Sequence, residues 1–187
     1  MAVIDENENV QMSYLKPEQD GEIRERALCA NPMTHSTTIF RRVLGERIGF
    51  YDESLAGYQD WDLWLKIAAE LPVEFVSEPL VLYRQSSSGC LTRDMKATDR
   101  LREMELVVER GLRTRPVTSA TRRRAQSSLD LQWAANWLQE RNQRRAVSRS
   151  LRAIRARPGC GHAYRLLAYS LLPGGSRDWL KHRLGKA

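Results

Sequence analysis

GYQDWDLWLK, residues 57–66, places two acids, two tryptophans and one glycine within ten positions. From residue 61 onward the apolar side chains recur at three- and four-residue spacing, which is typical of one face of a helix. These positions are Trp61, Trp64, Leu65, Ala68 and Leu71. The segment before them, Asp52-Glu53-Ser54, is rich in turn-forming residues and is expected to be a loop. Asp60 is therefore expected at, or just before, the start of a helix.

Asp60 has two interpretations. A carboxylate at a helix start accepts backbone N–H bonds, and the positive end of the helix dipole keeps it ionised. Aspartate is therefore common as a helix cap, and a stripe of tryptophan and leucine usually belongs to a core. Alternatively, an ionised carboxylate beside aromatic rings that exclude water suits a general base. The residues alone favour the cap-and-core interpretation.

Four motifs, one of them within the stretch above, occur in a fixed order along the chain. They are HSTTIFRR (residues 35–42), IGFYDESL (48–55), QDWDLWL (59–65) and EPLVLYR (78–84). Together they resemble the acceptor-side half of a family 2 glycosyltransferase of the GT-A type, with the resemblance covering residues 1–93. The resemblance implies that Asp60 is the base that deprotonates the acceptor hydroxyl. Gln59 stands where that family usually has glutamate.

The same resemblance implies a set of substrate-binding residues. They are Gln59, Trp61, Asp62, Tyr83, Arg84 and His35. Arg84 has two interpretations, because its guanidinium fork suits a nucleotide diphosphate but also suits a surface salt bridge. His35 either faces the acceptor pocket or makes a local hydrogen bond.

The implied reaction is an inverting sugar transfer from a nucleotide sugar to the hydroxyl of a glycan or lipid-linked acceptor. The family uses a divalent cation, Mg²⁺ or Mn²⁺, which an Asp-x-Asp motif holds at the leaving diphosphate. That motif is not expected in this chain, since Asp60-Trp61-Asp62 matches the base rather than the metal site. Ser86 also replaces a histidine that many relatives carry near the metal. We therefore expect a truncated copy without the donor and metal half, inactive by itself.

The fold class expected from these patterns is α/β, a partial GT-A domain with an incomplete mixed sheet, followed by an α-helical hairpin region. Residues 1–93 would form the first part and residues 94–187 the second. Charge supports this division: residues 1–92 carry a net charge of −7, whereas residues 93–187 carry +14. The second part resembles a single degenerate tetratricopeptide-like unit, which must pack on something else to cover its faces.

Local patterns predict the elements in more detail. We expect a hairpin over residues 3–15 and β segments over residues 35–42, 72–76 and 79–84. Helices are expected over residues 21–29, 43–48, 61–71, 96–112, 120–140, 144–156 and 162–172, with a short amphipathic segment over residues 176–184.

A second class of function is non-catalytic. Residues 93–187 would then be a basic helical adaptor for a partner protein, anionic lipid or nucleic acid, although arginine-rich solvated helices are the favoured interpretation of this charge. Nucleic acid is the least favoured partner, because the arginines are not interleaved with stacking aromatics. Contact with a membrane surface would run through the basic C-terminal helices.

The cellular location follows from what the sequence lacks. No run of about 18 apolar residues is present, and the first residues do not read as a signal peptide. The three cysteines, Cys29, Cys90 and Cys160, are odd in number and scattered, which fits a reducing compartment. We expect a cytoplasmic protein, peripheral at the inner face of the membrane if it binds lipid.

Overall fold

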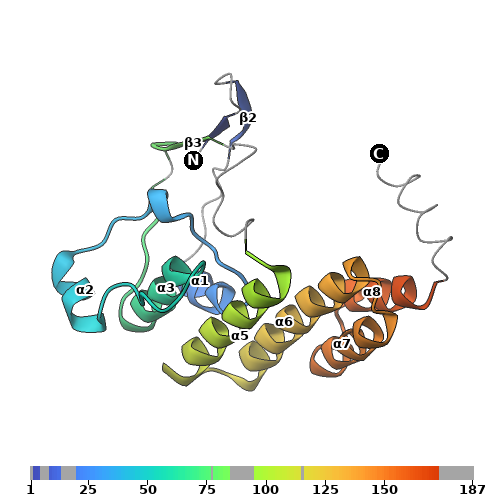
Figure 1. The fold of residues 1–187 in the computed structure, drawn as a ribbon. Coiled ribbons are helices and arrows are strands. Elements are labelled where there is room, and N and C mark those ends of the chain that lie inside the picture. Colours follow the sequence, from blue (N-terminus) through green and yellow to red (C-terminus); the bar gives the residue numbers. More distant parts are fainter. Residues whose placement is uncertain are drawn as a thin grey trace. The chain divides into compact units, whose positions relative to one another are not determined.

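The computed structural model describes residues 2–4, 9–13, 20–76, 78–84, 95–114 and 116–172 (Figure 1). The chain divides into two compact units, which we call the N-terminal unit (Met1–Thr121) and the C-terminal unit (Arg122–Ala187). Charge patterning places the division near residue 93 instead. The segment between these two positions holds a helix that packs within the N-terminal unit, as described below.

A small mixed sheet contains the described strands. Its order is β2-β1-β3, formed by β1 (Ala2–Ile4), β2 (Val10–Ser13) and β3 (Leu82–Arg84). β1 runs antiparallel to β2, with Ala2 opposite Ser13 and an irregularity between Val3 and Ile4. β1 also runs parallel to β3, with Val3 opposite Tyr83. The expected N-terminal hairpin is thus confirmed.

The α/β GT-A prediction is wrong, because the described residues are mostly helical and the sheet consists of strands only three or four residues long. Residues 35–42 were expected as a β run, yet they form the 3₁₀ helix η1 (His35–Thr37) and an extended segment. Residues 72–76 likewise form no strand. The side chain of Ile39 is 99% exposed. β-branched residues become a strand only where a partner strand and a buried face are present, and neither segment has them.

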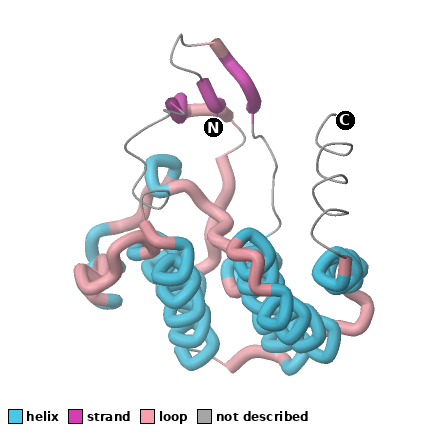
Figure 2. The backbone as a smooth tube through the Cα atoms, turned by 45° about the vertical axis from the view of Figure 1, so that its right-hand side comes forward, coloured by secondary structure: helices cyan, strands magenta, loops and turns pink. Residues whose placement is uncertain are grey.

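The helices of the N-terminal unit gather around α3 (Gln59–Glu70). α1 (Asp20–Ala27), α2 (Arg42–Ile48) and α5 (Ala97–Thr114) each pack against it. α2 ends at Gly49, whose φ of 85° is the left-handed conformation that glycine adopts without strain. Figure 2 draws the described helices of the chain as cyan tubes. The expected helical ranges are confirmed to within a few residues.

The core of the N-terminal unit lies on α3. Trp61, Trp64, Leu65 and Ala68 of the expected stripe are buried, whereas Leu71 at its end is 47% exposed. Leu63, which the stripe did not include, is buried as well. The approach of α5 is close at Gly111, where an added Cβ would lie 2.9 Å from Leu65 and 3.0 Å from Leu28. A glycine at this position lets three helices meet without a gap.

The C-terminal unit contains α7 (Gln143–Ala156), α8 (Gly161–Leu171) and most of α6 (Ser119–Gln139). Its fully buried positions are mostly small. The small residues among them are Ala125, Ala134, Ala146, Ser150, Ala153 and Ala163. Small side chains allow helices to approach closely, and the Ser127 hydroxyl donates to the Ala153 carbonyl at 3.1 Å. The expected segment over residues 176–184 lies outside the described residues. None of the described helices is both long and apolar enough to cross a membrane.

Candidate functional site

Asp60 lies in the first turn of α3, one residue inside the helix whose N-cap is Tyr58. Its Oδ1 accepts the backbone N–H of Trp61 at 2.6 Å, and its Oδ2 accepts the side-chain amide of Asn31 at 3.2 Å. The side chain is half-buried rather than sealed in the core. The carboxylate thus accepts two N–H donors and lies at the positive end of the helix dipole.

Tyr51 and His35 complete what we call the Asp60 cluster (Asn31, His35, Tyr51 and Asp60). The Tyr51 hydroxyl oxygen and His35 Nε2 are 2.9 Å apart and share one hydrogen bond. The His35 ring also meets the edge of Trp64, with centroids 6.3 Å apart. Burial raises the pKa of Tyr51, and the negative charge of Asp60 raises it further. Tyr51 therefore stays protonated at neutral pH and can donate a hydrogen bond beside the carboxylate.

α5 holds the loop that leads into this cluster. The carboxylate of Glu103 accepts the backbone N–H groups of Ala56 and Gly57, at 2.7 and 2.9 Å. These two residues immediately precede Tyr58, the cap of α3. The position of Asp60 is thus set by a helix about forty residues further along the chain, through charge-assisted hydrogen bonds.

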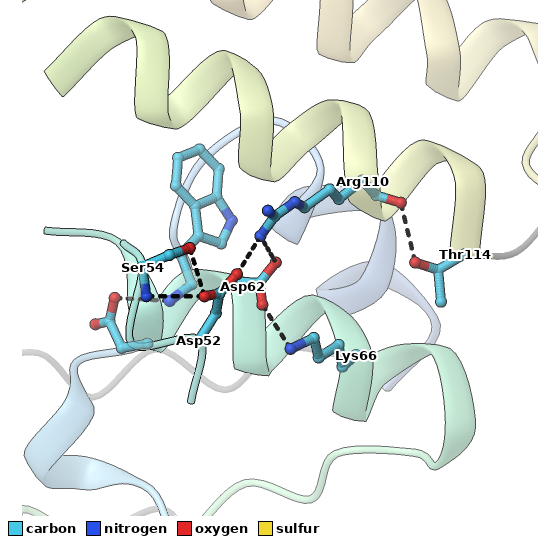
Figure 3. A network of polar contacts seen from close by, with 8 residues as sticks. Asp52, Ser54, Asp62, Lys66, Arg110 and Thr114 are labelled. Atoms are coloured by element: carbon cyan, nitrogen blue, oxygen red, sulfur yellow. Dashed lines mark hydrogen bonds and ion pairs between the residues drawn. The ribbon is translucent and has the colours of Figure 1, made fainter. Parts of the chain in front are cut away.

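A second polar contact between α5 and the same loop is the ion pair of Arg110 with Asp52 (Figure 3). Asp52 accepts from the backbone N–H and hydroxyl of Ser54 at 2.9 and 2.6 Å, and from Arg110 at 2.6 Å. These hydrogen bonds, with those from Ser54 contributing most and Arg110 next, lower the pKa of Asp52 from 3.8 to about 2. The loop therefore carries a permanent negative charge at any physiological pH.

Asp62, predicted to bind substrate, is only 2% exposed. It forms an ion pair with Lys66 at 2.7 Å, and Arg110 lies 3.8 Å from its other oxygen (Figure 3). Asp60 and Asp62 are two positions apart on a helix and have separate sets of partners, so they do not converge on one point. They do not fit a metal site, and the described residues contain no group of three or more metal-binding side chains.

Gln59 and Trp61 flank Asp60 and differ in placement. Gln59 is the first residue of α3, and its buried Oε1 has no hydrogen-bond partner among the described residues. Trp61 is 1% exposed, and its indole N–H donates to the Ala27 carbonyl at 2.6 Å. Tyr58 also packs against the Trp61 ring, with centroids 5.6 Å apart, so this ring is closed to solvent in the structure. Gln59 stays a substrate-binding prediction, and Trp61 serves as the anchor between α1 and α3.

Tyr83 and Arg84 lie in β3, opposite Val3 and Ile4 of β1. The Asp60 cluster is built instead from η1, the loop after α1, the loop after α2 and the start of α3. A role for Tyr83 and Arg84 in binding substrate therefore stays a prediction.

The sequence pattern did not identify Asn31, Tyr51 or Glu103 as parts of the site. Tyr51 belongs to the IGFYDESL motif and was available as a candidate, whereas Asn31 was read only as the end of a helix. Glu103 gives no local signal, since it is one of several acids on an amphipathic helix. Its contact with Ala56 and Gly57 exists only because α5 packs on α3.

The chemistry that this arrangement can perform is limited and clear. A carboxylate offers about four lone-pair positions, and Trp61 and Asn31 occupy two of them. The remaining positions can accept the proton of a hydroxyl group.

No protein-family model matches the sequence, and comparisons with curated proteins and with solved structures give no significant match either.

Proposed function

We propose that the Asp60 cluster binds a hydroxyl group of a sugar acceptor, and that Asp60 is the general base of an inverting glycosyl transfer from a nucleotide sugar. This is the chemistry that the resemblance to family 2 glycosyltransferases implies. Because the fold departs from that family's α/β sheet, support comes from the site and not from the architecture.

The observation that carries this proposal is the state of the Asp60 carboxylate. It is half-buried, oriented by the Trp61 N–H and the Asn31 amide, and has lone pairs left for a ligand. Its neighbour Tyr51 is a protonated hydroxyl that can hold a second oxygen of the same sugar. A carboxylate that only capped the helix would not need the Asn31 amide from a loop 29 residues away.

The proposed step is a single displacement. The acceptor O–H gives its proton to Asp60 as its oxygen forms a bond to the anomeric carbon of the donor sugar. The bond from that carbon to the diphosphate breaks at the same time, and the diphosphate leaves with the electron pair. One carboxylate is sufficient, whereas glycoside hydrolysis through a displacement needs two. The acceptor would be a glycan or a lipid-linked saccharide.

The test titrates the full, isotope-labelled chain with a panel of neutral oligosaccharides and follows its backbone amide resonances by two-dimensional NMR. We expect at least one oligosaccharide to bind and to perturb the amide resonances of Asn31, Tyr51 and Asp60. Asp60→Ala should weaken this binding about tenfold or more, because a hydrogen bond to a charged group is lost. The matched control is Asp99→Ala, which removes a carboxylate from the first turn of α5 instead.

Equal binding by the two variants would show that Asp60 is only a helix-stabilising residue. A panel without any binder would contradict the acceptor proposal outright. Where transfer from UDP-, GDP- or dTDP-sugars is also observed, Asp60→Asn should abolish product while acceptor binding persists, since the amide cannot take the proton.

The cytoplasmic location is part of the same proposal. Neither Cys29 nor Cys160 forms a disulfide with another described residue, and both side chains are partly exposed. Partly exposed thiols persist in a reducing compartment, which is also where nucleotide sugars would be supplied. Fractionation of cells that express the chain, with a thiol-labelling reagent as the readout, tests this location.

A further inference from the structure

One face of α7 is exposed along the whole helix. Arg144, Ser148, Leu151, Arg152 and Arg155 recur at spacings of three and four residues and are all exposed; we call this the outer face of α7. Ala146, Ser150 and Ala153 are fully buried on the opposite side. The helix therefore has a packed side of small residues and a free side rich in arginine.

The arginines of α7 differ in whether they form an ion pair or a ring contact with another described residue. Asp130, which is 0% exposed, holds Arg149 at 2.8 Å and Arg152 at 3.4 Å. The guanidinium of Arg145 lies over the ring of Trp137, 4.5 Å from its centroid. Arg144 and Arg155 are exposed and form no ion pair with another described residue. Both belong to the outer face.

The surrounding chain cannot balance this charge. Residues 122–172 contain eleven arginines and only two acids, Asp130 and Glu140. Like charges three and four residues apart, such as Arg152 and Arg155, destabilise a helix, and a cation in the first turn opposes the helix dipole. An anionic partner on the outer face would remove this cost, so charge complementarity identifies the kind of partner.

Nucleic acid fits this surface poorly. Recognition of single strands needs aromatic rings that are free to stack on bases. Trp133 and Trp137 stack on each other, with centroids 5.7 Å apart, and Arg149 and Arg145 cover them. The aromatic rings of α6 are thus already occupied by the chain's own guanidinium groups.

A membrane surface fits better than a folded acidic protein. The outer face is a single convex helix with one exposed apolar residue, Leu151, which is 42% exposed. Protein partners need matching shape around buried anchors, whereas anionic lipids diffuse laterally and can gather beneath any arrangement of arginines. A leucine among arginines also suits shallow contact with the lipid interface.

We propose that the outer face of α7 binds the surface of a membrane containing anionic phospholipid. This inference is independent of the Asp60 cluster, which lies in the other unit. It would place an enzyme acting on lipid-linked acceptors beside its substrate, but neither assignment requires the other.

The test is sedimentation of the full chain with vesicles that contain about 30% phosphatidylglycerol in phosphatidylcholine. Arg144→Gln/Arg155→Gln should lower affinity about 30-fold, because each arginine near an anionic surface accounts for a factor of about five. The matched control, Arg42→Gln/Arg113→Gln, removes the same charge from exposed helix positions in the N-terminal unit. The control should bind like the unmodified chain.

Two further measurements decide the nature of the contact. Binding should fall steeply between about 0.05 M and about 0.5 M salt, because screening shortens the range of charge interactions. Leu151→Gln should weaken binding by a smaller factor. An equal loss in both arginine variants, equal binding to pure phosphatidylcholine, or tighter binding to a single-stranded RNA than to the anionic vesicles would each overturn the proposal.

Discussion

The two units share one structural feature, a buried carboxylate paired with two cations, but differ in the sign of their net charge. Each buries one carboxylate almost completely, Asp62 in the N-terminal unit and Asp130 in the C-terminal unit, and each pairs it with two cations. Around Asp62, one of the two cations, Arg110, also binds Asp52. Asp130 pairs with Arg149 and Arg152, and residues 122–172 contain nine further arginines.

This difference shows that the charge at the surface of each unit depends on which charged side chains are in excess after the ion pairs within the unit have formed. The N-terminal unit has more acids than bases, so a carboxylate, Asp60, remains at the surface, where it can accept a proton. Most charged residues of the C-terminal unit are arginines, so there are more guanidinium groups than carboxylates to pair with them. The excess guanidinium groups can bind anions. A buried carboxylate stabilises each unit only while its cations are present, since an unpaired buried charge is costly.

The largest expected effect comes from the core of the N-terminal unit. Trp61→Ala should lower the free energy of unfolding of this unit by about 4 kcal/mol, because a buried tryptophan is lost together with its hydrogen bond to Ala27. Trp61→Phe should cost only about 1–2 kcal/mol. Hydrogen exchange measures both, with amides of α3 and α7 reporting separately. Loss of protection in α7 as well as α3 would mean that the units are not independent.

The second prediction concerns the buried carboxylate of the C-terminal unit. Asp130→Ala should destabilise that unit by about 3 kcal/mol, because Arg149 and Arg152 lose their counter-charge. Glu140→Gln, which changes the unit's only other described acid, should change stability by less than about 0.5 kcal/mol. Urea denaturation followed by hydrogen exchange in α7 compares them. Similar stability for both variants would contradict the conclusion that a buried, paired carboxylate stabilises the C-terminal unit.

The third prediction concerns the loop before α3. Glu103→Gln should cost about 1–2 kcal/mol, because an amide oxygen can replace only one of the two charged acceptors that hold Ala56 and Gly57. The amide of Gly57 should exchange faster, and any acceptor binding at Asp60 should weaken. Glu109→Gln, on the exposed side of α5, is the control. Unchanged exchange at Gly57 would show that α5 does not position the loop.

The smallest effect is a pH dependence. The pKa of Asp52 is about 2 in the folded chain against an ordinary 3.8, so its hydrogen bonds stabilise the fold above about pH 4. This contribution should be lost as the pH falls from about 4 to 2, and solvent screening keeps it to a few degrees in Tm. Asp52→Asn should reduce the acid slope of Tm over this range. An identical slope in the variant would rule out the contribution of Asp52.

Local patterns predicted the helices well, because an amphipathic helix is stable when its apolar face packs against any other apolar surface. Leu101, Met104 and Val108, which recur at three- and four-residue spacing on α5, are buried. The β segments were predicted poorly, since Ile39 and residues 72–76 have the right composition but no partner strand. The candidate base Asp60 was identified from its motif, whereas Asn31 and Glu103 were not.

The sequence by itself determined the helix that carries Asp60, the inward stripe of Trp61 and Trp64, and the excess of arginine after residue 93. These depend on spacing and composition, which are local properties of the chain. Only the tertiary structure decided that Asn31 contacts Asp60, that the charge of Asp60 acts on Tyr51, and that Glu103 of α5 holds the loop before α3. It also decided that Asp130 pairs with Arg149 and Arg152, while Arg144 and Arg155 form no ion pair with another described residue. Contacts between distant residues depend on how helices pack, and no local pattern encodes that packing.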